Sequence, residues 1–278
     1  MELAGRNLRF GERTYVMGVI NLTPDSFSGD GLRGDAAAAL QQARRFVAEG
    51  ADILDIGGES TRPGAAEVGG QAEIDRVAPA ISAIAAELEV PISIDTRHAD
   101  VAAAALAAGA TMVNDVTGLQ GDPAMAGVVA KAGVPVVLQH IQGTPQNMQQ
   151  NPEYEDVVED VWAGLRERLR LAEAAGIARE QCIIDPGIGF GKKLEHNLRL
   201  FRRLGELRTL GCPILVGPSR KSFIGRLLGT EAQHGIEGTA AAVAICIAHG
   251  ADLVRVHDVG AMVRVVKVAD ALVRGRLA

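Results

Sequence analysis

The sequence contains few aromatic residues and no excess of basic residues. Aromatics make up 3% of the 278 residues, and 28 Lys and Arg residues face 34 Asp and Glu residues, for a net charge of -6. Nucleic acid is therefore not expected as a partner, because no broad basic surface can form. The longest apolar runs, residues 102–108 and 240–248, are far shorter than the roughly 20 residues that span a bilayer. No membrane segment is expected either.

Cysteine is scarce as well. Cys182, Cys212 and Cys246 each lie in or beside an apolar run, and none belongs to a CxxC motif. This pattern predicts reduced, buried thiols rather than disulfides or metal ligands. The first ten residues lack the apolar segment of a secretory signal peptide. Together these features predict a cytoplasmic protein.

Apolar residues and glycine are plentiful, with 47% of the chain apolar and 33 glycines, which excludes a disordered chain. A core of Val, Ile, Leu and Ala is typical of parallel strands that alternate with packed helices. Eight short apolar runs read as such strands. They are residues 15–21, 52–56, 91–95, 111–114, 134–140, 182–185, 213–217 and 253–257.

Helical stretches with an apolar repeat of about 3.6 residues lie between these runs. Examples are residues 35–49, 73–87, 99–108, 155–175, 194–210 and 238–248. Several end at a glycine, which stops a helix in the left-handed conformation. Eight strand–helix units in about 250 residues predict a single-domain α/β (β/α)8 TIM barrel over residues 1–278, with its core at about 14–275. A doubly wound open sheet is the alternative, but it usually has fewer strands.

Polar residues stand at nearly every predicted strand end. They are Asn21, Asp55, Asp95, Asn114, Gln139 or His140, Asp185, the Ser219–Arg220–Lys221 segment, Arg255 and His257. Strand ends of a barrel converge on one rim, and buried polar groups without partners are costly, so the set predicts a ligand site. Carboxylates and an amide suit the N–H groups of a flat heterocycle, whereas the cations suit phosphate. We therefore expect an aminated heterocycle with an anionic tail.

Two long, glycine-containing loops follow the first two strands, at residues 23–34 and 57–70. Loops of this length are uncommon in compact domains and often act as lids. In the second loop Arg62 stands between Thr61 and Pro63, which predicts a contact with an anion.

The chain closely resembles the dihydropteroate synthase family of pterin-binding barrels over residues 17–257. The resemblance is carried by MGVINLTPDSFS (17–28), DIGGESTRPGA (55–65), SIDT (93–96), VNDV (113–116), DPGIGFGK (185–192), GPSRKSFIG (217–225) and RVHDV (255–259). It implies a homodimeric TIM barrel. It also implies an enzyme that joins 4-aminobenzoate to 6-hydroxymethyl-7,8-dihydropterin diphosphate and releases pyrophosphate and 7,8-dihydropteroate.

The resemblance also implies roles for individual residues. The expected pterin ligands are Asp95, Asn114, Asp185 and Lys221, and the residues expected near the diphosphate are Thr61, Arg255 and His257. Asn21 is the expected Mg²⁺ ligand. The expected aminobenzoate pocket comprises Phe27, Arg62, Pro63, Phe190 and Ser219. Of these, Asp95, Asp185, Lys221, Arg255 and His257 are expected to take part in catalysis.

The residue types predict a mainly dissociative displacement. Mg²⁺ takes oxygen ligands, as the Asn21 amide could supply, and cations such as Arg255 and His257 can neutralise charge on the leaving diphosphate. An aniline nitrogen is already nucleophilic, so no strong base is required.

Two departures from the family pattern leave alternatives open. Gln139 and Ile141 flank His140 where the family commonly has methionines, and the first loop reads Gly29-Asp30-Gly31 instead of Asp-Gly-Gly. A catalytically inactive pterin-binding paralogue or dimeric interaction module is one alternative. Another is a methyltetrahydrofolate–corrinoid methyltransferase, which shares the ring contacts but has no need of Arg62, Lys221 or the Arg255–His257 pair.

Overall fold

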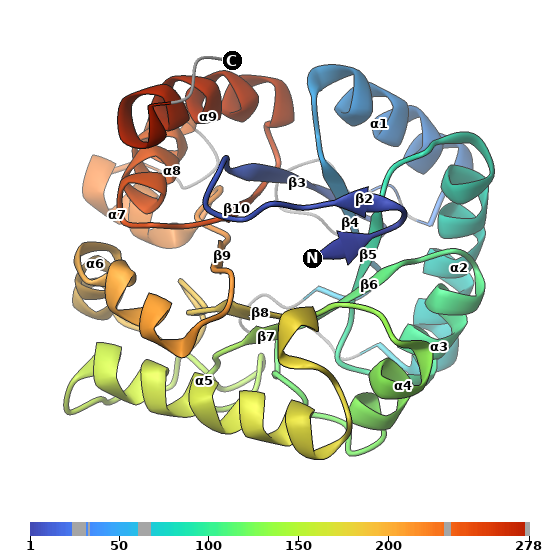
Figure 1. The fold of residues 1–278 in the computed structure, drawn as a ribbon, viewed down its shortest axis with the longest axis horizontal. Helices are drawn as coiled ribbons and strands as arrows, with labels where there is room; N and C mark the ends of the chain where they lie inside the picture. The colour runs from blue at the N-terminus through green and yellow to red at the C-terminus, as the bar shows by residue number, and fades with distance from the viewer. Residues whose placement is uncertain (24–31, 33, 61–67, 231–234, 276–278) are drawn as a thin grey trace.

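Eight parallel strands form a nearly closed barrel in the computed structural model, which describes residues 1–23, 32, 34–60, 68–230 and 235–275 (Figure 1). The strands are β3 (Tyr15–Asn21), β4 (Ile53–Gly57), β5 (Ile92–Asp95), β6 (Met112–Asp115), β7 (Val136–Gln139), β8 (Cys182–Asp185), β9 (Leu215–Val216) and β10 (Leu253–Val256). Their order is β8-β7-β6-β5-β4-β3-β10-β9. A parallel bridge between Ile184 and Ile214 joins the two ends of this order. The expected (β/α)8 barrel is therefore confirmed.

Helices surround the barrel on its outer side. They are α1 (Ala36–Glu49), α2 (Gly70–Glu87), α3 (Ala99–Ala107), α4 (Met125–Ala132), α5 (Val157–Ala174), α6 (Leu194–Arg202), α7 (Ser222–Leu228), α8 (Ile236–Ala248) and α9 (Val259–Arg274). Two 3₁₀ segments, Arg179–Gln181 and Leu204–Leu210, precede β8 and β9. The helical stretch expected at 194–210 is thus divided at Arg203. Gly205, a poor helix former, follows the break.

Helix α1 shows how the chain makes its tight turns. The Asp35 carboxylate accepts the backbone N–H groups of Ala37 and Ala38, which caps the start of the helix. The helix ends at Gly50, whose φ of 100° lies in the left-handed region. In β3, a Cβ at Gly18 would lie 2.8 Å from the Phe46 ring. Glycine therefore allows close packing of α1 on the barrel.

A short N-terminal hairpin, β1 (Glu2–Leu3) and β2 (Arg6–Asn7), covers the end of the barrel where the strands begin. The sequence pattern did not predict it. Leu3 and Leu8 are buried and belong to one cluster with residues that point into the barrel. The inward-pointing residues are Tyr15, Met17, Ile53, Met112, Val137, Ile183, Leu215 and Leu253. This end is therefore sealed by apolar side chains, and polar groups gather at the opposite end.

The outer layer completes the core, which is built from Val, Ile, Leu and Ala between strands and helices. The three cysteines are free and buried. Within the described residues, no helix combines the length and the apolar character needed to cross a lipid bilayer.

Candidate functional site

A pocket opens at the carboxyl ends of the barrel strands. It is lined by Asp95, Asn114, Val116, Gln139, Asp185, Ile188, Phe190, Gly217, Lys221 and Arg255. The register explains the convergence: Asp95 pairs with Asn114 across β5 and β6, and Gln139 pairs with Asp185 across β7 and β8. The structure thus brings together five of the expected pterin and diphosphate ligands on one rim. They are Asp95, Asn114, Asp185, Lys221 and Arg255.

Arg255 lies at the centre of this polar group. Its Nε donates to Asp55 Oδ2 at 2.6 Å, and a terminal guanidinium nitrogen donates to Asp95 Oδ2, also at 2.6 Å. Asn114 Nδ2 donates to the same Asp55 oxygen at 3.1 Å. The sequence-based expectation placed Arg255 against a phosphate, whereas here its guanidinium is held between two carboxylates. The arginine therefore fixes the two acids as well as supplying a positive charge.

Several polar atoms of the pocket are buried without a hydrogen-bond partner among the described residues. They are Asp95 Oδ1, Asn114 Oδ1 and Gln139 Nε2. Native structures satisfy most buried polar atoms, and leaving one unsatisfied costs about 1–3 kcal/mol. Two acceptors and one donor at the pocket wall therefore indicate a ligand edge that offers N–H groups and an acceptor.

Burial shifts the titration of both pocket carboxyls. Burial raises the pKa of Asp95 to about 7, although Arg255 favours the charged form. Burial likewise raises the pKa of Asp185 to about 6, opposed by a 2.7 Å hydrogen bond from the Gly187 N–H and by Lys221. For Arg255, burial would lower the pKa, but Asp55 and Asp95 raise it overall. The pocket thus contains carboxyls that titrate near neutrality beside an arginine that stays charged.

Lys221 and Phe190 form another wall of the pocket. The Lys221 ammonium lies 4.0 Å from the centroid of the Phe190 ring, a cation–π arrangement. Lys221 precedes the first residue of α7, and Phe190 lies in the loop between β8 and α6. The Phe190 ring also packs with Ile141 and Met148. Ile141, which follows β7 and departs from the family pattern, therefore supplies apolar surface behind this wall.

Ser219 and His257 are direct neighbours. Ser219 Oγ lies 3.0 Å from His257 Nδ1 and accepts the His257 backbone N–H at 3.2 Å. The resemblance assigned the two residues to different halves of the site. Their contact places them where β9 and β10 end side by side.

Asn21 is the last residue of β3 and pairs with Gly57 of β4. It is half-buried, and its carboxamide makes no hydrogen bond to the residues that the structure describes. Asn21 does not line the pocket around Asp95. Four expected site residues, Phe27, Thr61, Arg62 and Pro63, lie outside the described residues, as does the Gly29-Asp30-Gly31 segment.

Sequence reasoning gave no role to three residues that the structure places in or beside the site. Asp55 was noted at a strand end, and its contact with Arg255 could not be seen without the barrel. Gln139 was named, as the alternative to His140, among the strand-end residues and was also treated as a departure from the family pattern; it lines the pocket. Lys192 was part of a quoted motif, yet its side chain is 3% exposed, which a lysine in a glycine-rich loop does not suggest.

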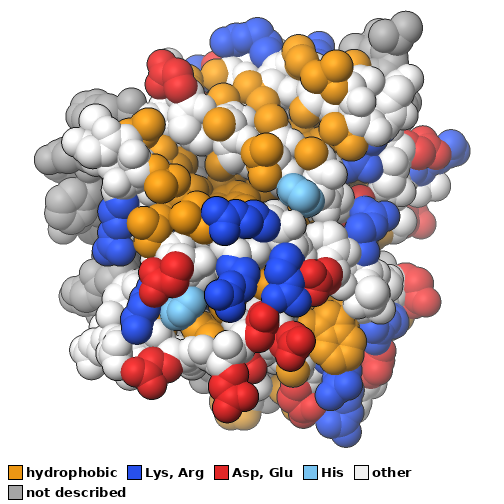
Figure 2. Space-filling model, turned by 90° about the vertical axis from the view of Figure 1, so that its left-hand side faces the viewer, with side chains coloured by type: hydrophobic (Ala, Val, Ile, Leu, Met, Phe, Trp, Pro, Cys, Tyr) orange, Lys and Arg blue, Asp and Glu red, His pale blue; other side chains and the backbone are white. Residues whose placement is uncertain are grey.

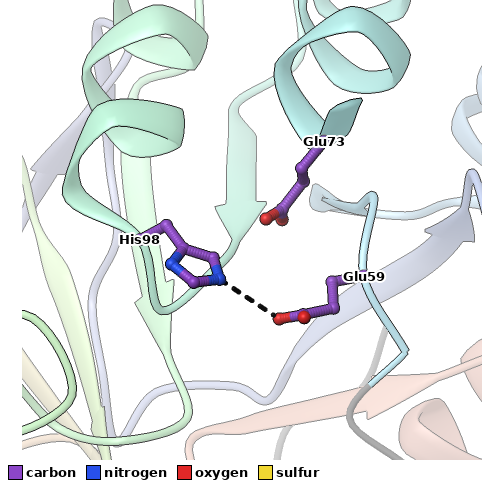
Figure 3. A group of neighbouring side chains, drawn as sticks. All are labelled: Glu59, Glu73 and His98. Atoms are coloured by element: carbon purple, nitrogen blue, oxygen red, sulfur yellow. Dashed lines mark ion pairs between the residues drawn. The ribbon is translucent and has the colours of Figure 1, made fainter. Parts of the chain in front are cut away.

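A separate group of titratable side chains lies just after β4 and β5 and at the start of α2, where Glu59, Glu73 and His98 point toward one another (Figure 3). The Glu59 carboxylate accepts two hydrogen bonds from Arg97, at 3.0 and 3.2 Å, and the Val68 N–H at 2.9 Å. His98 Nε2 lies 3.6 Å from Glu59. The Glu59 carboxylate is thus already bonded to Arg97. The Arg97 guanidinium supplies the positive charge that a metal ion would bring to this cluster.

Glu73 is the unusual member of this group. It is fully buried, and neither carboxyl oxygen has a hydrogen-bond partner in the described part of the chain. Burial, with a smaller contribution from Glu59, raises its pKa to about 8. The Glu73 carboxyl is therefore mainly protonated at neutral pH.

The family comparisons agree with the geometry of the pocket. The model of the family described as pterin binding enzyme matches residues 17–257. A curated dihydropteroate synthase of Synechocystis is 49% identical over 95% of this chain and 92% of its own length. A Yersinia pestis dihydropteroate synthase, solved in a sulfonamide drug complex, superposes with a TM-score of 0.95 at 41% identity and covers 99% of each chain. A Xanthomonas albilineans dihydropteroate synthase in complex with 7,8-dihydropteroate gives a TM-score of 0.84 at 42% identity over 94% of each chain.

The chain belongs to the pterin-binding enzyme family and, within it, to the dihydropteroate synthases.

The buried Glu73 carboxyl predicts a pH-dependent stability. Its pKa is about 8 in the folded chain against an ordinary 4.5, so the folded state binds the proton more tightly. Stability is then lost as the pH rises from about 4.5 toward 8, by up to ~1.4 kcal/mol per pH unit. Glu73→Gln has no carboxyl to titrate at this position, so it should not show this loss. Urea unfolding should therefore give the variant a free energy of unfolding that exceeds the wild-type value by an increasing amount between pH 5 and 8.

Glu159→Gln is the matched control, because Glu159 also lies in the first turn of a helix but is exposed. This variant should follow the wild-type curve. Parallel curves for wild type and Glu73→Gln at every pH would show that Glu73 is ionised in the folded chain.

Proposed function

We propose that the protein transfers the pterinylmethyl group of 6-hydroxymethyl-7,8-dihydropterin diphosphate to the amine of 4-aminobenzoate, yielding 7,8-dihydropteroate and pyrophosphate. The observation that carries this proposal is the pocket itself, which is lined both by acceptors on Asp95 and Asn114 that have no partner among the described residues and by the Lys221–Phe190 pair. The first set suits a flat ring with N–H donors. The second suits an arylamine that carries a carboxylate.

The pterin ring would be held by the acids and amides at the strand ends. Asp95, fixed by Arg255, would keep Oδ1 for ring N–H groups, and Asp185 would contribute a second carboxylate. Gln139 Nε2 would offer a donor to a ring acceptor. Buried polar groups that are left unpaired without the ring give strong discrimination against flat ligands that lack its N–H pattern.

The charges of the pocket favour a displacement in which the bond to the diphosphate breaks early. Three carboxylates, on Asp55, Asp95 and Asp185, surround the positive charges of Arg255 and Lys221. When ionised, the carboxylates of Asp95 and Asp185 at the pocket wall stabilise positive charge spread over the pterin and its methylene. Arg255 and His257 would favour charge on the departing pyrophosphate, and the amine needs no strong base.

Asn21 is the residue that we propose as the protein ligand of Mg²⁺. Its neutral oxygen fits an ion that keeps several waters and takes substrate phosphate oxygens. Its carboxamide is also uncommitted among the described residues. When bound, the ion would neutralise charge on the diphosphate leaving group.

We further propose that the protein acts in the cytoplasm as a homodimer. Exposed apolar side chains lie on α7, α8 and α9, and Figure 2 shows many hydrophobic side chains gathered in its upper half, with white groups between them. The exposed side chains on these helices are Leu227, Leu228, Ile236, Ile245, Val268, Leu272 and Val273. An exposed apolar face of this kind marks an interaction surface, and a second copy buries it in a two-fold interface.

The synthase activity is tested by pyrophosphate release with the pterin diphosphate, 4-aminobenzoate and Mg²⁺, omitting each in turn. Release above background should require all three. Lys221→Ala should lower kcat/KM by about 10²-fold or more, because a charge that contacts both substrates is lost. Lys131→Ala, an exposed lysine on α4, is the control and should retain wild-type turnover. Release without 4-aminobenzoate at the full rate would refute the transfer.

The Mg²⁺ proposal is tested by titrating the metal against activity. Asn21→Ala should raise the Mg²⁺ concentration for half-maximal turnover by about tenfold, equivalent to roughly 1.4 kcal/mol. Asn7→Ala, on the exposed β2 strand, should leave the titration unchanged. An unaltered titration in Asn21→Ala would exclude Asn21 as a ligand.

The dimer is tested by light scattering after size-exclusion chromatography. Wild type should have about twice the mass of one chain. Leu272→Asp, at the most exposed of the apolar positions (82%), should shift the equilibrium toward monomer, because a charge in an apolar interface is costly. Leu171→Asp on α5 lies outside the patch and should remain dimeric. A monomeric wild type would contradict the proposal.

A further inference from the structure

Lys192 is a buried lysine at the end of the loop that carries Phe190. Its ammonium donates to the Phe190 carbonyl oxygen at 2.9 Å and lies 3.1 Å from His140 Nδ1 and 3.4 Å from the His140 carbonyl oxygen. Only 3% of the residue is exposed. Burying an ammonium is costly unless it is fully bonded, so this lysine binds the loop to the end of β7.

The loop between β8 and α6 packs very closely against the segment that follows β7. A Cβ at Gly187, whose φ is +67°, would lie 1.9 Å from the His140 carbonyl oxygen. A Cβ at Gly191 would lie 2.7 Å from the Gln142 carbonyl oxygen. The two glycines bring the backbones together, and the Lys192 ammonium joins them at the point of contact.

The Phe190 side chain has two constraints of its own. The Lys221 ammonium lies over one face of its ring, and Ile141 and Met148 pack with it. None of these contacts fixes the backbone of Phe190. The Phe190 N–H bonds to the Gly187 carbonyl within the loop. The neighbouring residues are held from outside, Gly189 by Gln149 and Asn197 and Gly191 by Tyr154. The hydrogen bond from Lys192 adds the contact at the Phe190 carbonyl itself.

We propose that Lys192 is a positioning residue that fixes Phe190 beneath Lys221 and thereby shapes the aminobenzoate half of the pocket. This inference rests on the proposed synthase function. Lys192 does not line the pocket, so it would act through Phe190 and not by touching a substrate. Without this amine, as in Lys192→Met, the Phe190 and His140 carbonyl oxygens would lose a donor and the aromatic wall would move relative to Lys221.

The surroundings of Lys192 make this contact sensitive to pH. His140 faces it from the end of β7, Asp185 from the end of β8, Arg168 from α5 and Lys221 from the start of α7. Burial lowers the pKa of Lys192 to about 7, and Arg168 and Lys221 add to this effect, while Asp185 opposes it. Burial, with Lys192 and Arg168, also lowers the pKa of His140, which is therefore neutral and can accept at Nδ1.

The test compares Lys192→Met and Lys192→Arg with Lys193→Met, a control at the adjacent, less buried lysine. Lys192→Met should raise KM for 4-aminobenzoate by about tenfold or more. Loss of the lysine would displace the Phe190 ring, and a displacement of about 1 Å in an active site can cost up to about 10²-fold in activity. Affinity for the pterin diphosphate, measured by calorimetry, should change less than threefold. In Lys192→Arg the KM for 4-aminobenzoate should lie much closer to the wild-type value, and in Lys193→Met it should equal that value.

The pH profile separates a positioning role from a merely structural one. In wild type, KM for 4-aminobenzoate should rise as the pH passes about 7, because a deprotonated Lys192 has only two N–H groups for the three acceptors around it. In Lys192→Arg, whose guanidinium stays charged, this rise should be absent. If Lys192→Met does not fold, the profiles of wild type and Lys192→Arg decide between the outcomes.

A wild-type KM and an unchanged pH profile in the Lys192 variants would overturn the inference while the synthase activity stands. Equal losses of affinity for both substrates would also overturn it, because they would indicate a general disturbance of the pocket. Absence of turnover in wild type would instead refute the proposed function.

Discussion

The Arg255 guanidinium, held between Asp55 and Asp95, is the interaction on which the rest of the site depends. It joins the ends of β4, β5 and β10 through two contacts of 2.6 Å. Removing either acid would leave the arginine with one carboxylate instead of two, whereas removing the arginine would leave two buried carboxylates without their cation, at a cost of several kcal/mol. The arginine therefore determines where the Asp95 carboxylate stands, and Asp95 in turn determines where a flat ring can bind.

The barrel can leave polar atoms without hydrogen-bond partners at one end because its stability comes from elsewhere in the fold. The apolar seal of Leu3 and Leu8 closes the other end, so the hydrophobic core supplies stability at a distance from the pocket. At the rim, Asp95 and Asp185 have raised pKa values because they are buried, and their ionised forms are unfavourable for folding at neutral pH. Sites that bind ligands commonly retain such unfavourable groups because the ligand satisfies them.

Much of the fold could be predicted from the sequence, because the patterns that indicate strands and helix ends are local. Buried parallel strands are continuously apolar, and glycines such as Gly50 end helices in the left-handed conformation. The N-terminal hairpin did not follow, because two residues per strand give no periodic pattern. The division of the 194–210 stretch was equally hidden. A single glycine inside an amphipathic run does not by itself end a helix.

The site was predictable only in part, for a different reason. Strand-end positions gave Asp95, Asn114 and Asp185, since barrel topology brings such residues to one rim. The contacts among them depend on side chains from strands up to 200 residues apart, as in Arg255 and Asp55. Composition carries no information about such pairs. Lys192 was hidden because burial of a lysine depends on how two loops pack, and that is a property of the folded chain.

The central claim is that Asp55 acts on pterin binding chiefly by holding Arg255, beside its weaker contact with Asn114. It is tested most directly by a double-mutant cycle, with Asp55→Asn, Arg255→Met and the double variant titrated calorimetrically with the pterin diphosphate. The account predicts that Asp55→Asn weakens binding in the wild-type background and has a much smaller effect when Arg255 is already replaced, because only the contact with Asn114 is then left to lose. Losses that add independently would contradict it.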